Sequence, residues 1–205
     1  QGQTTTVTLR DANPGQAIML TGTGLSLTTD VVFRVSDAAG NVTEQLVNPT
    51  AVNGTTEITV LVPVDAVTGT VQIVGDQLNN ALLLQIVPVV TTADLTSVSA
   101  TTANFTLSGF GFIEGTGTRY QLGTLSIVDP GVGTGPDTFS SNTRANLSTA
   151  FTDGLFGAVT VTTAGGTSVP YSVGYTELAS TALSGTAAQA GQASANPGQV
   201  VTVRG

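Results

Sequence analysis

The feature that most constrains the fold of this chain is a short sequence motif that occurs twice. Residues 12–22 read ANPGQAIMLTG and residues 195–205 read ANPGQVVTVRG, so five consecutive residues are identical and a glycine closes both stretches. A motif that returns further along a chain is typical of tandem repeats, in which one structural unit is built several times. We therefore expect these 205 residues to be a window of a longer repeat array.

A longer match lies inside the chain. When the numbering is shifted by 87, IMLTGTGL at residues 18–25 lies on FTLSGFGF at residues 105–112. The same shift places Phe33 on Tyr120, and with one inserted residue the match extends to a last strand at residues 169–173. This match predicts one module at residues 1–90, a second at 91–176, and a linker with the start of a third module at 177–205.

Alternating apolar and polar residues indicate the fold class. Short runs of this kind, bounded by Gly, Pro, Asn or Asp, recur along the chain without any long helical period, which is typical of β-sandwiches. About seven strands per module is the usual number in an immunoglobulin-like sandwich. We therefore predict an all-β chain with two tandem immunoglobulin-like β-sandwiches plus the first strand of a third module. In the first module the predicted strands are residues 4–10, 17–20, 31–35, 42–47, 57–62, 69–74 and 81–87.

Residue types that are absent argue against several functions. The sequence contains no Cys, His, Lys or Trp, and its formal net charge is −8. Nucleophilic catalysis through Ser–His, Cys–His or Ser–Lys pairs therefore lacks its residues, and we expect no enzyme activity; a hydrolase using two carboxylates is the remaining catalytic alternative. A net negative charge disfavours nucleic acid as a partner. No apolar run approaches the roughly 18 residues of a membrane span.

The modules resemble a known family in their glycine-rich breaks. In LTGTGL at residues 20–25 and LSGFGF at residues 107–112, the end of a strand is followed by two glycines one residue apart. The residue between them is Thr or Phe, and the residue after the second glycine, Leu25 or Phe112, is the apolar residue expected to close the end of the core, called here the plug. Together with the late strand that ends at Val62 and Pro63, these features resemble the IPT/TIG group of immunoglobulin-like domains. The second module departs from this pattern, with Ala150 in place of the proline and a longer loop at residues 129–141.

The resemblance implies a fold and a range of roles. Tandem IPT/TIG-type domains occur in large bacterial cell-surface and extracellular repeat proteins, and others are accessory modules of glycan-acting proteins. The first role implies a non-catalytic structural repeat of a long secreted or cell-surface protein, such as a stalk, filament or surface-layer building block. The second role implies an adhesin or glycan-binding module. Because free strand edges attract other strands, we expect close packing of neighbouring modules or assembly with copies of the chain into a filament.

Aromatic residues are concentrated in the second module and offer candidate glycan contacts. Phe110 aligns with Thr23, so it is expected to point away from the core, and Phe139 and Phe151 stand in stretches that look like loops. These three phenylalanines are the candidate contact residues. Packing in the core or between modules is the simpler interpretation of each.

Calcium is the metal that the remaining oxygen ligands suit best, and no other cofactor is expected. The loop at residues 129–137 carries Asp129 and Asp137 together with free carbonyl groups, which makes these two residues the candidate ligands. Asp30 and Asp37 flank a strand and are a weaker candidate pair. The simpler interpretation of both pairs is ordinary solvated loop acids.

Overall fold

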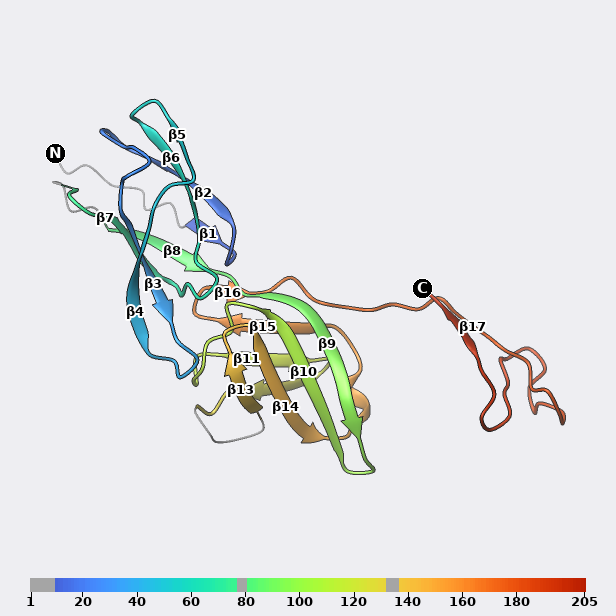
Figure 1. The fold of residues 1–205 in the computed structure, drawn as a ribbon. Helices are drawn as coiled ribbons and strands as arrows, with labels where there is room; N and C mark the ends of the chain where they lie inside the picture. The colour runs from blue at the N-terminus through green and yellow to red at the C-terminus, as the bar shows by residue number, and fades with distance from the viewer. Residues whose placement is uncertain (1–9, 77–80, 132–136) are drawn as a thin grey trace, which may run out of the picture. The chain divides into compact units, whose positions relative to one another are not determined.

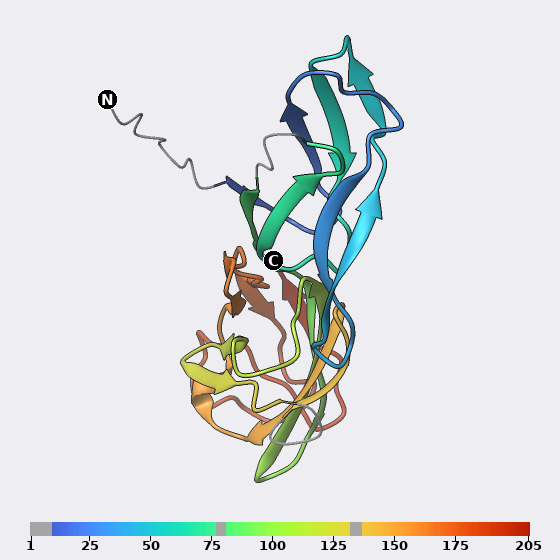
Figure 2. The same cartoon turned by 90° about the vertical axis from the view of Figure 1, so that its left-hand side faces the viewer.

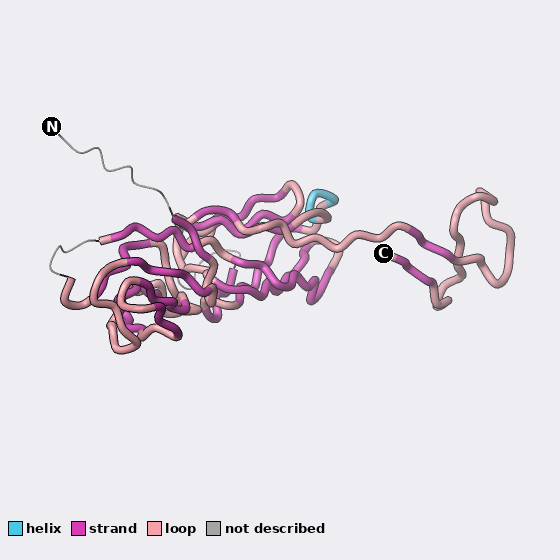
Figure 3. Tube along the Cα trace, turned by 90° about the horizontal axis from the view of Figure 1, so that it is seen from above, coloured by secondary structure: helices cyan, strands magenta, loops and turns pink. Residues whose placement is uncertain are grey.

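A computed structural model describes residues 10–76, 81–131 and 137–205 of the chain. It divides into two compact units, residues 1–171 and residues 172–205. Strands and loops make up almost all of the described residues, and a 3-10 helix, η1 (Asp153–Leu155), is drawn in cyan in Figure 3. Among the described residues, no helix has the length and apolar character that a membrane crossing requires. The predicted all-β class is confirmed.

The first sandwich of unit 1 consists of two facing sheets (Figure 1). One sheet has the order β1-β8-β7-β3-β4 and the other has the order β2-β6-β5. Between them lies a core that includes Phe33, Ile58 and Val60, which are almost fully buried. The strands are β1 (Arg10–Ala12), β2 (Ala17–Thr21), β3 (Val31–Ser36), β4 (Val42–Val47), β5 (Ala51–Asn53), β6 (Glu57–Leu61), β7 (Gly69–Ile73) and β8 (Leu82–Ile86).

The second sandwich follows the same plan with a bulkier core. Its sheets have the orders β13-β14-β10-β9 and β12-β11-β15-β16, and Figure 2 shows them beside the first sandwich within unit 1. Phe112 and Tyr120 meet edge to face in the core, with ring centroids 6.4 Å apart. The strands are β9 (Val89–Val98), β10 (Thr102–Phe110), β11 (Arg119–Leu122), β12 (Leu125–Val128), β13 (Asp137–Ser141), β14 (Arg144–Ala150), β15 (Val159–Thr163) and β16 (Gly166–Thr167).

Residues that the 87-residue shift aligns have the same role in the two sandwiches. The plug residues Leu25 and Phe112 are both buried, and the aligned Phe33 and Tyr120 are 1% and 0% exposed. The strands β2 and β10, which carry the aligned stretches, each pair antiparallel with the late strand of their own sandwich, β6 or β14. The alignment of the two modules therefore matches positions that have the same burial and the same strand partner in both sandwiches.

Three predicted elements differ from the structure or lie outside it. The strand expected at residues 169–173 is wrong: β16 ends at Thr167, and beyond it only Tyr171 bridges to Val159. Pro170 explains the interruption, because proline has no N–H to donate to a ladder. The loop expected at residues 129–141 is wrong for its last part, where β13 pairs with β14. The strand expected at residues 4–10 lies outside the described residues except for Arg10, which belongs to β1.

The repeated motif builds the same turn in both units. In the first copy, Gln16 N–H donates to the Asn13 carbonyl at 3.1 Å, and the Gln16 side chain accepts from Asn13 N–H at 2.9 Å. In the second copy, Gln199 and Asn196 make the same two bonds at 3.0 and 3.1 Å. The glycine between them has a φ of +77° at Gly15 and +78° at Gly198.

Unit 2 contains the strand that follows this second turn. β18 (Thr202–Arg204) pairs antiparallel with β17 (Glu177–Ala179), and Leu178 lies opposite Val203. Because a shift of 183 aligns Val203 with Leu20, β18 corresponds to part of β2. That β18 is the first strand of a further module stays a prediction.

The two sandwiches of unit 1 meet through a short connection and close backbone contacts. Only Val87 and Pro88 separate β8 from β9. The Asn142 side-chain amide donates to the carbonyl of Ser36, on β3 of the first sandwich. Gly165 packs so closely against the first sandwich that an added Cβ atom would lie 2.0 Å from the Ile86 carbonyl oxygen. This joint has no room for a larger side chain at that position.

Candidate contact surface

The three candidate phenylalanines do not form one cluster. Phe110 is the last residue of β10 and is half-buried, whereas Phe151 follows β14 next to the opposite end of β10, where its N–H donates to the Thr101 carbonyl at 3.1 Å. With a rise of about 3.3 Å per residue, the length of β10 separates these two positions by roughly 25 Å. Phe139 lies in β13, opposite Ala145, and its side chain is outside the described residues. One shared platform of all three side chains is therefore not formed.

An exposed aromatic pair forms around Phe151 instead. Phe151 and Phe156 lie on either side of η1, with ring centroids 6.0 Å apart and an interplanar angle of 79°. Their exposed fractions are 38% and 61%, so both rings are open to solvent on one side. Edge-to-face packing holds the two rings in a fixed relation, which an isolated surface ring lacks.

Phe156 was not among the candidate contact residues from the sequence. The sequence held one signal for this pair: two phenylalanines five residues apart with Gly154 between them. A turn at this glycine brings the two rings together on the same side of the turn. Leu155, between them, is buried and anchors the turn to the second core. Thus the buried leucine directs its aromatic neighbours outward.

Asp129, one candidate calcium ligand, organises a loop by accepting backbone hydrogen bonds. It is fully buried, its Oδ2 accepts from Gly115 N–H at 3.1 Å, and its Oδ1 accepts from Gly131 N–H at 2.8 Å. Asp137 begins β13, but its side chain and residues 132–136 are outside the described part of the chain. No group of three acidic residues that could hold a metal is found among the described residues. Calcium binding by Asp129 and Asp137 stays a prediction.

We expect Asp129→Ala to destabilise the second sandwich by about 1.5 to 3 kcal/mol, because two backbone N–H groups lose a charged acceptor in a buried place. The measurement is urea denaturation of the full chain, followed by hydrogen exchange within β10 and β14. Asp94→Ala, which removes an exposed carboxylate from β9, is the matched control and should change stability little. An unchanged midpoint for Asp129→Ala would contradict this role.

The weaker candidate acids, Asp30 and Asp37, are held by asparagine side chains. The Asn48 side-chain amide donates to Asp30 at 2.9 Å. Asp37 closes the β3–β4 turn by accepting from the Asn41 side chain and from the backbone N–H groups of Ala39 and Asn41, each at 2.9 Å. The hydrogen bond from the Asn41 side chain, then that from its backbone, lowers the pKa of Asp37.

The lowered pKa of Asp37 gives the turn a defined pH dependence. A carboxylate whose pKa is lower in the folded state contributes stability that is complete above its ordinary pKa of about 3.9 and is lost as pH falls through the lower folded value. We therefore expect the Asn41 amide signals in NMR spectra to shift only below about pH 4. In Asp37→Asn this acidic transition of the Asn41 signals should disappear. A transition of the Asn41 signals at neutral pH would show that a group other than Asp37 controls the turn.

No protein-family model matches the chain, and no curated protein matches its sequence. The repeat, the two cores and the exposed aromatic pair are therefore the observations on which a function must be argued.

Proposed function

We propose that this chain is a non-catalytic structural segment of a long secreted or cell-surface protein built from IPT/TIG-type immunoglobulin-like modules. The observation that carries the proposal is the recurrence of the ANPGQ turn, with the same two hydrogen bonds and the same glycine conformation in both units. A segment that repeats both its sequence and its local geometry is suited to build length by stacking similar units.

The close joint between the two sandwiches of unit 1 supports a structural role. The two-residue connection between β8 and β9 leaves little freedom between the sandwiches, and Gly111 packs where an added Cβ atom would lie 3.0 Å from Pro14. Pro14 belongs to the repeated turn, so the motif itself takes part in the contact. A stalk or filament needs such short, packed joints, because flexible linkers would let neighbouring modules swing freely.

Strand edges that have no partner among the described residues support assembly with further copies. β4 ends one sheet and exposes Val42 and Leu46, which are 44% and 61% exposed. β9 ends another sheet and exposes Leu95 and Val98. Such edges pair readily with other strands unless something covers them, which fits lateral association in a fibre or surface layer.

The proposal is tested by measuring how rigid the joint is. Because the chain has no cysteine, Val52→Cys and Val98→Cys place one spin label on each sandwich without side reactions. We expect pulsed electron paramagnetic resonance to give one narrow distribution of the distance between the two spin labels. Gly165→Ala, which forces a Cβ atom against the Ile86 carbonyl, should broaden it, whereas Gly117→Ala, with open space at the Cβ position, should not. A broad distribution in the unaltered joint would overturn the stalk role.

A glycan-binding module is the second candidate function, and the exposed Phe151–Phe156 pair favours it. Aromatic faces open to solvent provide the apolar stacking surface that sugar rings use. We expect Phe156→Ala to abolish any hit on a glycan array, while Leu95→Ala, an exposed residue on β9, leaves it unchanged. An array on which the unaltered chain binds no glycan would remove this candidate.

A further inference from the structure

The edge of β2 that faces away from β6 has no strand partner among the residues that the structure describes. On the β6 side, the Gly22 N–H donates to the Thr56 carbonyl at 2.9 Å. Backbone groups alternate in direction along an antiparallel strand, so those of Leu20 also point toward β6. Those of Met19 and Thr21 point to the open edge. The open edge of β2 is therefore able to pair with a further strand.

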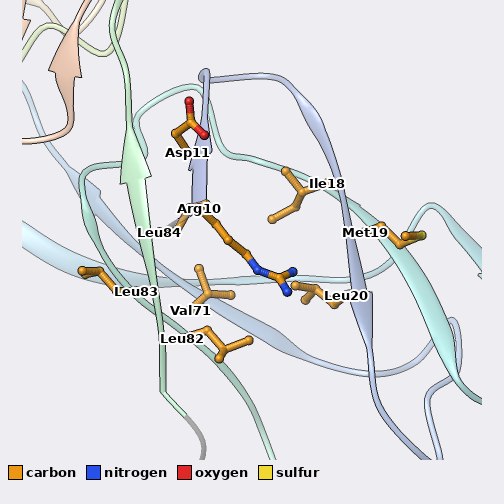
Figure 4. Close-up of a pocket in the computed structure, with 9 residues that line it drawn as sticks. All are labelled: Arg10, Asp11, Ile18, Met19, Leu20, Val71, Leu82, Leu83 and Leu84. Atoms are coloured by element: carbon orange, nitrogen blue, oxygen red, sulfur yellow. The ribbon is translucent and has the colours of Figure 1, made fainter. Parts of the chain in front are cut away.

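A groove of about 300 Å³ lies between β2 and the facing strands β7 and β8 (Figure 4). Aliphatic side chains from both sheets line it, among them Leu20, Val71 and Leu82. Leu82 is 51% exposed, so apolar surface of the first sandwich stays open to solvent here. The Arg10 side chain extends across the groove toward Leu20 and brings a positive charge to it (Figure 4). The groove thus suits a strand that carries both an apolar side chain and an acid.

The counterpart of β2 in unit 2 has a strand partner on this same edge. The shift of 183 aligns Thr21 with Arg204 of β18, and the Arg204 carbonyl accepts a hydrogen bond from the Thr176 N–H, next to β17, at 2.7 Å. Since Thr21 directs its backbone groups to the open edge, β17 occupies on β18 the edge that is open on β2. In the second sandwich, β10 likewise pairs with β9 on the edge away from β14. Both counterparts of β2 are therefore paired on that edge.

We propose that β17 of a second copy of this chain adds to the open edge of β2, in the register that β17 has with β18. In the β17–β18 ladder Leu178 lies opposite Val203, which aligns with Leu20. On β2, Leu178 therefore lies opposite Leu20, and Ala179 lies opposite Met19. Residues directly opposite each other in a ladder share a face of the sheet. The Leu178 side chain thus points, like that of Leu20, into the groove.

Burial and charge favour β2 over β18 as the partner of β17. In unit 2 Leu178 is 49% exposed and Val203 is 57% exposed, so their pairing leaves apolar surface in solvent. In the groove Leu178 meets aliphatic side chains from both sheets, and burial of apolar surface stabilises the contact. The ion pair of Glu177 with Arg204, at 3.5 Å, joins exposed groups and adds little to hold β17 on β18. At the groove, Arg10 supplies a positive charge beside the strand that carries Glu177.

Transfer of β17 links copies head to tail. Each copy offers one donor strand, in unit 2, and one acceptor edge, in the first sandwich of unit 1. A contact between two different surfaces of the same chain propagates into an open chain of copies unless its geometry closes a ring. The inference deepens the proposed structural role, on which it rests, by naming the contact between copies. The rigidity of the joint inside unit 1 is a separate measurement, so either proposal can fail alone.

Disulfide capture between two differently tagged full chains tests the pairing. Because the chain has no cysteine, Met19→Cys in one chain and Ala179→Cys in the other provide one thiol each. Paired strands bring opposite Cα atoms within the separation that a disulfide requires, so we expect the mixed dimer to form about tenfold faster than in the control. The control replaces Ala179→Cys by Leu183→Cys, an exposed position of unit 2 outside β17. Equal rates in the two mixtures would overturn the proposal.

The source of the strand is tested with both cysteines in one chain. Met19→Cys with Ala179→Cys, oxidised at high dilution, should give no bridge within the chain. An internal bridge under these conditions would assign β17 to its own chain and overturn the second-copy proposal.

Sedimentation velocity at rising concentration tests the role of Leu178. We expect the unaltered chain to form oligomers and Leu178→Asp to stay monomeric, because a carboxylate in an apolar groove loses its hydration without gaining a partner. Leu183→Asp is the matched control, since Leu183 is 85% exposed and lies outside β17, and it should assemble like the unaltered chain. Full assembly of Leu178→Asp would show that copies meet through other edges and overturn the proposal, as would an unaltered chain that stays monomeric throughout.

Discussion

Gly109→Ala should unfold the second sandwich or destabilise it by about 3 kcal/mol or more, because overpacking a buried site forces the surrounding backbone to move. A Cβ atom at this position would lie 1.9 Å from the Val89 carbonyl oxygen and 2.8 Å from the Phe112 ring. The first of these neighbours is backbone in the adjacent strand β9, so no side-chain rotation relieves the overlap. The β9–β10 ladder must separate to accept the methyl group.

The measurement is thermal and urea denaturation of the full chain, with hydrogen exchange read separately in the two sandwiches. Exchange in β10 and β14 should rise in Gly109→Ala. Gly117→Ala is the matched control, because Gly117 is exposed and an added Cβ atom meets nothing within 4 Å. A stable Gly109→Ala variant with native exchange in β10 would show that β9 does not approach β10 as closely as described.

The other large effect is expected for Phe33→Ala, which should destabilise the first sandwich by about 3 to 5 kcal/mol. Phe33 lies on β3, is 1% exposed and is the one aromatic residue among residues 1–90. Truncation removes its buried apolar surface and leaves a cavity that the smaller valines and leucines around it cannot fill. A loss of that size is a large fraction of the 5–15 kcal/mol that stabilises a typical domain.

This prediction is checked by urea denaturation and by hydrogen exchange within β3, β6 and β7. Phe156→Ala is the matched control, because it removes the same ring from a site that is 61% exposed. Phe33→Leu should recover much of the lost stability, since it restores most of the buried volume. Equal effects of Phe33→Ala and Phe156→Ala would contradict the placement of Phe33 in the core.

The candidate site was predicted less well than the fold, for a physical reason. Apolar alternation places a residue on a face of a sheet, and Phe33 alternates with the buried Val31 and Val35 in β3. It contains no information on which loops meet at a sandwich end. The pairing of Phe151 with Phe156 depends on how η1 folds over the second core, a local turn that no periodicity marks.

For Asp129, too, the structure shows a role that the sequence did not predict. From the sequence it was one of several loop acids. In the structure it is buried, and both of its carboxylate oxygens accept backbone hydrogen bonds. A solvated acid and a loop-organising acid have the same sequence signature, because the partners are backbone N–H groups that every residue type other than proline provides.

By itself, the sequence determined the all-β class, the recurrence of the ANPGQ turn and the residues that face each core. These follow from local turn chemistry and from a side-chain period of two, which act within a few residues. Only the tertiary structure decided which strand covers which edge: β1 pairs in parallel with β8, whereas β9 pairs along β10. A strand edge presents the same backbone N–H and carbonyl groups whatever its sequence, so its partner depends on which segments the packed sheets bring alongside.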